Sequence, residues 1–121
     1  MEKKWHILLI EDDKKDMLFF LEVHQNTQTP SKCTWAQTGD QALKQLAYIT
    51  PDIIYLDLEM PGTDGFQYLE MIRSIPRLQD IPVVVYAAEL TSGIRERAET
   101  LGATRCMEKP SGICSVVSGN G

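Results

Sequence analysis

The segment Asp52–Gly65 has the sequence D-I-I-Y-L-D-L-E-M-P-G-T-D-G, and it decides the predicted fold of this chain of 121 residues. Its first five residues, Asp52–Leu56, predict a short buried strand, and Asp57 follows where that strand should end. Met60-Pro61-Gly62 and Asp64-Gly65 supply turn-forming residues that end the strand and allow a helix to begin. A carboxylate at the carboxyl end of a central strand lies where ligands bind to open α/β sheets.

Strands and helices alternate on both sides of this segment. Short apolar runs are typical of strands buried on both faces, and the predicted strands cover residues 7–10, 33–36, 52–56, 83–86 and 103–108. Helices with one apolar face are predicted between them. They begin near Asp13, Gly39, Phe66 and Thr91, and they end at His24, before Pro51, before Pro76 and at Leu101. The apolar face of the second helix consists of Ala42, Leu43, Leu46 and Ala47.

The order of these elements predicts an α/β fold. It is a doubly wound, five-stranded parallel sheet in the order 2-1-3-4-5, with helices on both faces. This order places the most apolar strands, the first, third and fourth, in the centre. Residues 1–110 are predicted to form one domain, and residues 111–121 a short tail that contains Gly and Ser. Because this tail is poor in helix-forming residues, we expect the final helix to be short or absent.

Composition and charge limit the functions that this chain can have. It is 43% apolar and 24% charged, and its net charge of −5 disfavours binding of nucleic acid or of an anionic membrane surface. No apolar run approaches the ~20 residues of a membrane span, and the N-terminus leaves no room for a signal peptide. Cys33, Cys106 and Cys114 fit no metal or disulfide pattern, which favours reduced thiols in a cytoplasmic protein.

Charged residues follow three of the predicted strands at the point where each strand ends. Glu11-Asp12 follows the first strand, Asp57 the third and Lys109 the fifth. Because parallel strands point their carboxyl ends toward the same edge, we expect these side chains to converge. Three carboxylates in one crevice repel one another, and hard oxygen ligands with room for water suit Mg²⁺. Lys109 supplies a second, fixed positive charge.

Asp57 is the best candidate for a nucleophile in this cluster. It ends the central strand, and the loop that follows it is open to a donor. A carboxylate can attack a phosphoryl group while a metal ion and Lys109 neutralise the phosphoryl oxygens. Trp35, Tyr55 and Tyr86 are interpreted as residues that pack in the sheet, and Tyr86, which flanks the site, could also help to shape it.

Four segments together resemble the receiver domain of response regulators in two-component systems. They are I-L-L-I-E-D-D (residues 7–13), Y-L-D-L-E-M-P-G-T-D-G (55–65), P-V-V-V-Y-A-A (82–88) and L-G-A-T-R-C-M-E-K-P (101–110). Each segment alone is a weak signal, but their combination is specific, and the resemblance covers residues 5–110. It implies a flavodoxin-like fold and a signalling role rather than that of an enzyme. It also implies that a histidine kinase or a histidine phosphotransfer protein phosphorylates Asp57.

The resemblance assigns further roles to the clustered residues. It implies that Mg²⁺ is held by Asp12, Asp57 and the backbone carbonyl of Glu59, with Glu11 acting through water. It implies that Lys109 contacts the phosphoryl group and that the Lys109-Pro110 peptide bond is cis. The Glu59 side chain adds a negative charge close to the acceptor.

Two positions depart from the family pattern. Receivers carry Ser or Thr after the fourth strand, where the hydroxyl bonds the phosphoryl group, and this chain has Ala87. They often carry an aromatic switch residue in the fifth strand, and this chain has Cys106. A degenerate receiver that acts as a phosphorylation-independent docking module or homodimer is therefore an alternative. A third hypothesis is an aspartate-nucleophile phosphatase, but such enzymes usually have Asp at the position of Glu59. The downstream protein is unknown in each case.

Overall fold

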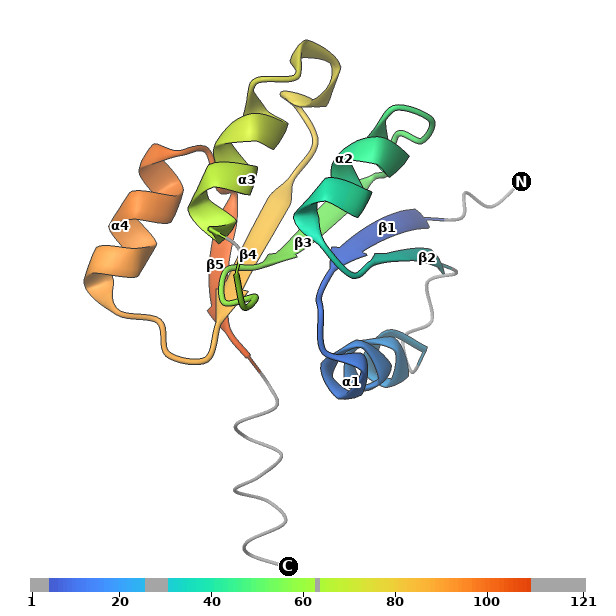
Figure 1. Cartoon of the computed structure of the whole chain (residues 1–121), viewed down its shortest axis with the longest axis horizontal. Helices are drawn as coiled ribbons and strands as arrows, with labels where there is room; N and C mark the ends of the chain where they lie inside the picture. The colour runs from blue at the N-terminus through green and yellow to red at the C-terminus, as the bar shows by residue number, and fades with distance from the viewer. Residues whose placement is uncertain (1–4, 26–30, 63, 110–121) are drawn as a thin grey trace, which may run out of the picture.

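The computed structural model describes residues 5–25, 31–62 and 64–109, and its centre is a five-stranded parallel sheet (Figure 1). The strand order is β2-β1-β3-β4-β5, which confirms the order predicted from the sequence. The strands are β1 (Trp5–Ile10), β2 (Ser31–Ala36), β3 (Ile53–Asp57), β4 (Val83–Ala87) and β5 (Arg105–Glu108). Asp57 is therefore the last residue of the central strand.

Helices cover both faces of the sheet, as the alternation of elements predicts. The helices are α1 (Lys14–Gln25), α2 (Gly39–Leu46), α3 (Gly65–Arg73), the short 3₁₀ helix η1 (Pro76–Leu78) and α4 (Ser92–Thr100). Figure 1 shows α1 on one face and α2, α3 and α4 on the other. Thr38, Asp64 and Thr91 cap α2, α3 and α4 with side-chain oxygens that accept backbone N–H bonds.

The two faces of the sheet have cores of different size. The larger core lies beneath α2, α3 and α4, where central-strand residues such as Leu8, Ile54 and Val85 pack against helix residues such as Leu69. The smaller core lies beneath α1, where Leu9, Met17 and Tyr86 are buried and Phe20, Leu21, Cys33, Trp35 and Tyr55 pack around them. The central strands are thus apolar on both faces, as strands of a parallel sheet are.

The second helix is shorter than predicted. α2 ends at Leu46, whereas the proline signal placed its end at Thr50. The Tyr48 amide bonds to the Gln45 carbonyl at 2.9 Å, so the chain tightens into a turn before the proline is reached. Ala47 is exposed and does not belong to the apolar face. The residue before a proline limits how far a helix can extend, but it does not fix where the helix ends.

Some predictions concern residues that the structure does not describe. The side chain of His24, the Lys109-Pro110 peptide bond and the tail at residues 111–121 lie outside the described part of the chain. The division into a domain at residues 1–110 and a tail therefore stays a prediction. Among the described residues, no helix is long and apolar enough to cross a membrane.

Candidate functional site

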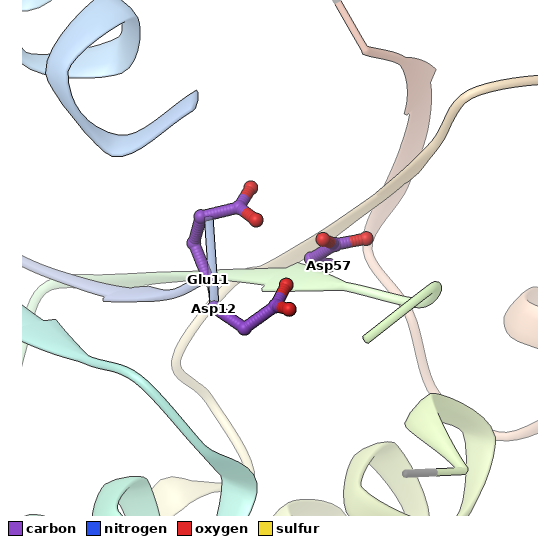
Figure 2. Close-up of side chains that lie close together, drawn as sticks. All are labelled: Glu11, Asp12 and Asp57. Carbon is purple, nitrogen blue, oxygen red and sulfur yellow. The ribbon is translucent and has the colours of Figure 1, made fainter. Parts of the chain in front are cut away.

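Three carboxylates meet at the carboxyl edge of the sheet. Glu11, Asp12 and Asp57 each offer one oxygen, and these oxygens all lie within 4.8 Å of one another. Figure 2 shows the three side chains around a common space. Glu11 and Asp57 are fully buried and Asp12 is exposed, so the cluster opens to solvent on one side. The structure thus brings together the three acidic residues predicted to converge.

The strand pairing explains this convergence. β1 and β3 are parallel neighbours in which Ile10 pairs with Leu56, so the residues that follow each of them lie side by side. The Glu11 amide donates to the Ala36 carbonyl at 3.0 Å, which fixes the chain as it leaves β1. The side chains of Glu11 and Asp57 are therefore held on rigid backbone.

Lys109 enters the cluster from the end of β5. Its amide donates to the Ala87 carbonyl at 2.8 Å, and its ammonium group lies 2.7 Å from Asp57 Oδ2. Glu11 Oε2 lies 3.8 Å from the same nitrogen. The ammonium also lies 3.2 Å from Asp16 Oδ2, a contact that was not predicted. Asp16 is in the first turn of α1, a position typical of an acidic residue that stabilises a helix start, so the sequence gave no signal for this contact.

The two oxygens of Asp57 have different surroundings. Oδ1 accepts a hydrogen bond of 2.8 Å from the Glu59 amide. Oδ2 is buried close to the Lys109 ammonium, but no group in the described ranges donates to it with hydrogen-bonding geometry. A buried carboxylate oxygen that lacks a directed donor retains the capacity to bind another group. Oδ2 is therefore the atom of this carboxylate that is available for a metal ion or for reaction.

Glu11 is held through both of its carboxylate oxygens. The Tyr86 hydroxyl donates to Oε1 at 2.9 Å, and the Asp13 amide donates to Oε2 at 3.2 Å. Burial raises the pKa of Glu11 to about 8, and the neighbouring Asp57 carboxylate adds to this effect. Burial lowers the pKa of Lys109, but the adjacent Asp57 carboxylate outweighs it and the net shift is upward. Burial and the Glu11 carboxylate raise the pKa of Tyr86, so its hydroxyl keeps its proton.

The donor set fits a hard divalent cation. Among the described residues, the Lys109 ammonium faces the carboxylates of Asp16 and Asp57, and Asp12 lies beside Asp57, which leaves an excess of negative charge even when Glu11 is protonated. Carboxylate oxygens with an open, solvated side are the environment that Mg²⁺ prefers, and Asp57 Oδ2 lacks a directed donor. Glu11, Asp12 and Asp57 are the residues that could hold such an ion.

Glu59 contacts the site with its amide and its side chain. Its carboxylate accepts a hydrogen bond from the Ala88 amide and so joins the loop after β3 to the loop after β4. The predicted role of its backbone carbonyl as a metal ligand stays a prediction. Ala87, at the end of β4, is fully buried and offers no hydroxyl, and Cys106 is a buried thiol of β5. Neither position supplies the polar or aromatic group that the family pattern places there.

Comparison with known proteins identifies the family. The response regulator receiver domain family matches residues 7–118, and the chain belongs to this family. Protein-glutamate methylesterase/protein-glutamine glutaminase 2 of Koribacter versatilis is 33% identical over 106 residues, which are 86% of this chain and 28% of that protein. The chain therefore spans less than a third of the length of that relative.

Solved structures agree with this assignment. The signal receiver domain of the DNA-binding response regulator merR from Colwellia psychrerythraea 34H has a TM-score of 0.81 at 31% identity, and the match covers 95% of this chain and 99% of that one. The phosphorylated cyanobacterial phytochrome response regulator RcpA has a TM-score of 0.81 at 29% identity, over 88% of this chain and 81% of that one. The fold and the signalling family are thus established.

Proposed function

We propose that Asp57 is a phosphoacceptor and that this domain receives a phosphoryl group in a two-component relay. The observation that carries the proposal is the state of Asp57. Its carboxylate is fully buried at the end of the central strand, and Oδ2 has an ammonium 2.7 Å away but no directed hydrogen-bond donor. A buried carboxylate that is paired with one ammonium and bordered by two further acidic side chains is suited to bind a cation and to react with a phosphoryl group.

The proposed step is an in-line phosphoryl transfer. An oxygen of Asp57 forms a bond to the phosphorus of a phosphohistidine as the P–N bond breaks, and the leaving imidazole takes up a proton from solvent. The Lys109 ammonium neutralises charge on the phosphoryl oxygens. The Glu59 amide holds Asp57 Oδ1, which orients the carboxylate. Mg²⁺, when bound by Asp12 and Asp57, supplies further positive charge to the phosphoryl group.

The donor and the output follow from the same proposal. The donor is a histidine kinase or a histidine phosphotransfer protein, and the chain is a signalling receiver that catalyses its own phosphorylation and dephosphorylation rather than a separate enzyme. The phosphorylated state of the similar response regulator RcpA supports this proposal. We place the domain in the cytoplasm, with its output through contact with another protein, and we assign no nucleic-acid binding to a chain with a net charge of −5.

A second candidate function is a docking or dimerisation module that does not depend on phosphorylation. Ala87 favours it, because this fully buried residue cannot form a hydrogen bond to a phosphoryl group. The two candidates differ in whether Asp57 accepts a phosphoryl group at all, so one experiment separates them.

The experiment is intact-mass measurement after incubation with acetyl phosphate and Mg²⁺. We expect one phosphoryl adduct on the wild-type chain and none on Asp57→Asn or in the presence of EDTA. Asp64→Asn is the matched control, because Asp64 is an exposed carboxylate that caps α3 and asparagine preserves the cap. No adduct on the wild type, or an equal adduct on Asp57→Asn, would overturn the proposal and favour the docking module.

A further inference from the structure

We infer that the Tyr86 hydroxyl is a positioning group for Glu11 and that it raises the affinity of the site for Mg²⁺. This inference rests on the proposed function, since it concerns the metal ion which that function requires. Tyr86 was expected to pack in the sheet and, because it flanks the site, to help to shape it. Its hydroxyl bonds a carboxylate of the acidic cluster at 2.9 Å, and the two residues are 75 positions apart in the sequence.

The placement of Tyr86 follows from the pleat of β4. Tyr86 pairs with Asp57 across β3 and β4, and its ring lies in the core beneath α1 with Leu9 and Met17. Successive side chains of a strand point to opposite faces, so Ala87 faces away from this core. The hydroxyl that β4 offers to the site therefore comes from the residue before Ala87. This hydroxyl bonds Glu11, which follows β1. It does not replace the Ser or Thr hydroxyl that the family pattern places at Ala87 to bond a phosphoryl group.

The bond lies in a buried environment, which increases its effect. Tyr86 is 6% exposed and Glu11 is 0% exposed. A hydrogen bond to a buried charged group is stronger than one between neutral groups in water, and the loss of its donor leaves a desolvated oxygen without a partner. The other charged groups near the Tyr86 ring and hydroxyl are Asp16, Asp57 and Lys109, whose ammonium lies 5.8 Å from the ring centre.

The backbone of Glu11 is already fixed by other contacts. The Trp35 indole donates to the Glu11 carbonyl at 2.6 Å, and the Glu11 amide bonds to the Ala36 carbonyl. Only the side chain remains to be oriented. The Tyr86 hydroxyl and the Asp13 amide hold one oxygen each, which fixes the plane of the carboxylate.

Without the Tyr86 hydroxyl, Glu11 has a competing partner. Its Oε2 atom lies 3.8 Å from the Lys109 ammonium, and a small rotation would shorten this distance. Glu11 would then pair with Lys109 instead of facing the cluster with Asp12 and Asp57. Tyr86 opposes this rotation, so the negative charge stays where a cation binds. Loss of such a partner of a metal-binding residue typically weakens metal affinity 10- to 100-fold.

The test is the Mg²⁺ dissociation constant of the full chain, measured by isothermal titration calorimetry at pH 8.5. We expect Tyr86→Phe to bind Mg²⁺ about tenfold more weakly than the wild type. Tyr68→Phe is the matched control. The Tyr68 hydroxyl, on α3, also donates to a carboxylate, that of Asp40 on α2, at 2.8 Å, but this pair lies outside the acidic cluster. We expect the control to bind Mg²⁺ as the wild type does.

A double-mutant cycle with Glu11→Gln shows whether Tyr86 acts through Glu11. If it does, Tyr86→Phe has little further effect on affinity in the Glu11→Gln background. Unchanged or tighter Mg²⁺ binding by Tyr86→Phe, or losses that simply add in the double variant, would overturn the inference. A purely structural role would lower the melting temperature in EDTA without changing the Mg²⁺ affinity.

A second measurement keeps the inference testable if Tyr86→Phe does not fold. In wild-type chain labelled with 3-fluorotyrosine, we expect the fluorine NMR signal of Tyr86 to shift on addition of Mg²⁺ and that of Tyr48, which is exposed, to stay in place. An unchanged Tyr86 signal at saturating Mg²⁺ would overturn the inference. If the wild type binds no Mg²⁺, both the proposed function and this inference fail. If the wild type binds Mg²⁺ and Tyr86→Phe binds it equally well, only the inference about Tyr86 fails.

Discussion

Two cationic side chains, Lys109 and Arg73, lie at opposite edges of the same sheet, and the oxygens around them differ in charge. Lys109, at the carboxyl edge, faces the carboxylates of Asp57, Asp16 and Glu11. Arg73, at the amino edge, donates to neutral oxygens within the described part of the chain. Its Nε donates to the Gly102 carbonyl at 2.7 Å, Nη1 donates to the carbonyls of Leu78 and Ile81 at 3.0 and 2.8 Å, and Nη2 donates to Thr104 Oγ1 at 3.1 Å.

The difference shows that the contacts of Arg73 at the amino edge stabilise the fold, whereas the functional site lies at the carboxyl edge. The planar guanidinium of Arg73 satisfies several carbonyls in fixed directions and joins α3, η1 and the loops before β4 and β5. Every bond there stabilises the fold. At the carboxyl edge, one ammonium faces several carboxylates, and Asp57 Oδ2 has no directed donor. That edge keeps unbalanced charge, which costs stability and creates a site for a cation and a phosphoryl group.

The largest effect is expected at the amino edge. Arg73→Met keeps the aliphatic stem but removes the donor to the Gly102 and Ile81 carbonyls and one of two donors to the Leu78 carbonyl, which still accepts from the Ile81 amide. We expect this variant to lower the free energy of unfolding by about 3 kcal/mol. Urea unfolding measures this change. Mg²⁺ affinity should not change.

Arg77→Met is the control for this prediction, because Arg77 is an exposed arginine of η1 with a single strong side-chain contact, to Thr50 Oγ1 at 3.1 Å. We expect it to change stability by less than about 0.5 kcal/mol. Equal losses in the two variants, or a loss of Mg²⁺ binding in Arg73→Met, would contradict the separation of the two edges.

The next effect is expected from Lys109→Met, and it should depend on Mg²⁺. In EDTA the variant leaves the buried carboxylate of Asp57 without its cation, and we expect a loss of about 2 kcal/mol in the free energy of unfolding. At saturating Mg²⁺ the deficit should shrink, because the ion takes over part of the neutralising charge. Lys44→Met, at an exposed position of α2, is the control. A deficit of equal size with and without Mg²⁺ would contradict this exchange of neutralising charge between Lys109 and the metal ion.

A fall in stability with rising pH is expected from Glu11 in EDTA. Folding raises its pKa from 4.5 to about 8, so the folded chain holds this proton more tightly than the unfolded chain does. Between these values the free energy of unfolding therefore falls as pH rises. Urea unfolding at several pH values should show this fall in the wild type relative to Glu11→Gln.

The difference in the free energy of unfolding between the wild type and Glu11→Gln contains no contribution from His6, because both chains have this residue. Burial lowers the pKa of His6, which gives a slope of the opposite sign near and below pH 6.5 in both chains. Parallel stability profiles of the two chains from pH 5 to 8 would show that Glu11 does not titrate in this range. Saturating Mg²⁺ should reduce the difference, because the metal ion favours the ionised carboxylate.

The smallest effect is expected from a change beside Arg73. Gly102 has a φ of +110°, and a Cβ atom there would lie 2.6 Å from Arg73 Cγ. We expect Gly102→Ala to lower the free energy of unfolding by about 1 kcal/mol, with no change in phosphorylation by acetyl phosphate. Gly93→Ala in α4 is the control, because the nearest atom to its added Cβ is 3.9 Å away and alanine favours a helix. An equal effect of both substitutions would contradict the role of this contact.

The sequence predicted most of the fold because the signals involved are local. Apolar runs such as Val83–Val85 and the starts of the helices near Phe66 and Thr91 depend on neighbouring residues, and each was placed correctly. The end of α2 was misplaced, because the Thr50-Pro51 signal sets an outer limit while the turn forms earlier. The strand order followed from the rule that the most apolar parallel strands are central.

The site was predicted less completely than the fold. Convergence of Glu11, Asp12, Asp57 and Lys109 follows from strand polarity alone, and the structure brings these residues together. The contact of Lys109 with Asp16 does not follow from strand polarity, because it depends on how α1 packs against the sheet.

By itself, the sequence determined which residues end up at the same edge of the sheet, because strand period and chain direction are local properties. Only the tertiary structure decided which oxygens the Lys109 ammonium approaches, where the Tyr86 hydroxyl points, and that Asp57 Oδ2 lacks a directed donor. A hydrogen bond requires two atoms within about 3 Å at a suitable angle. Distances of that size between residues as far apart in the sequence as Glu11 and Tyr86 are set by the packing of whole elements, which no local pattern encodes.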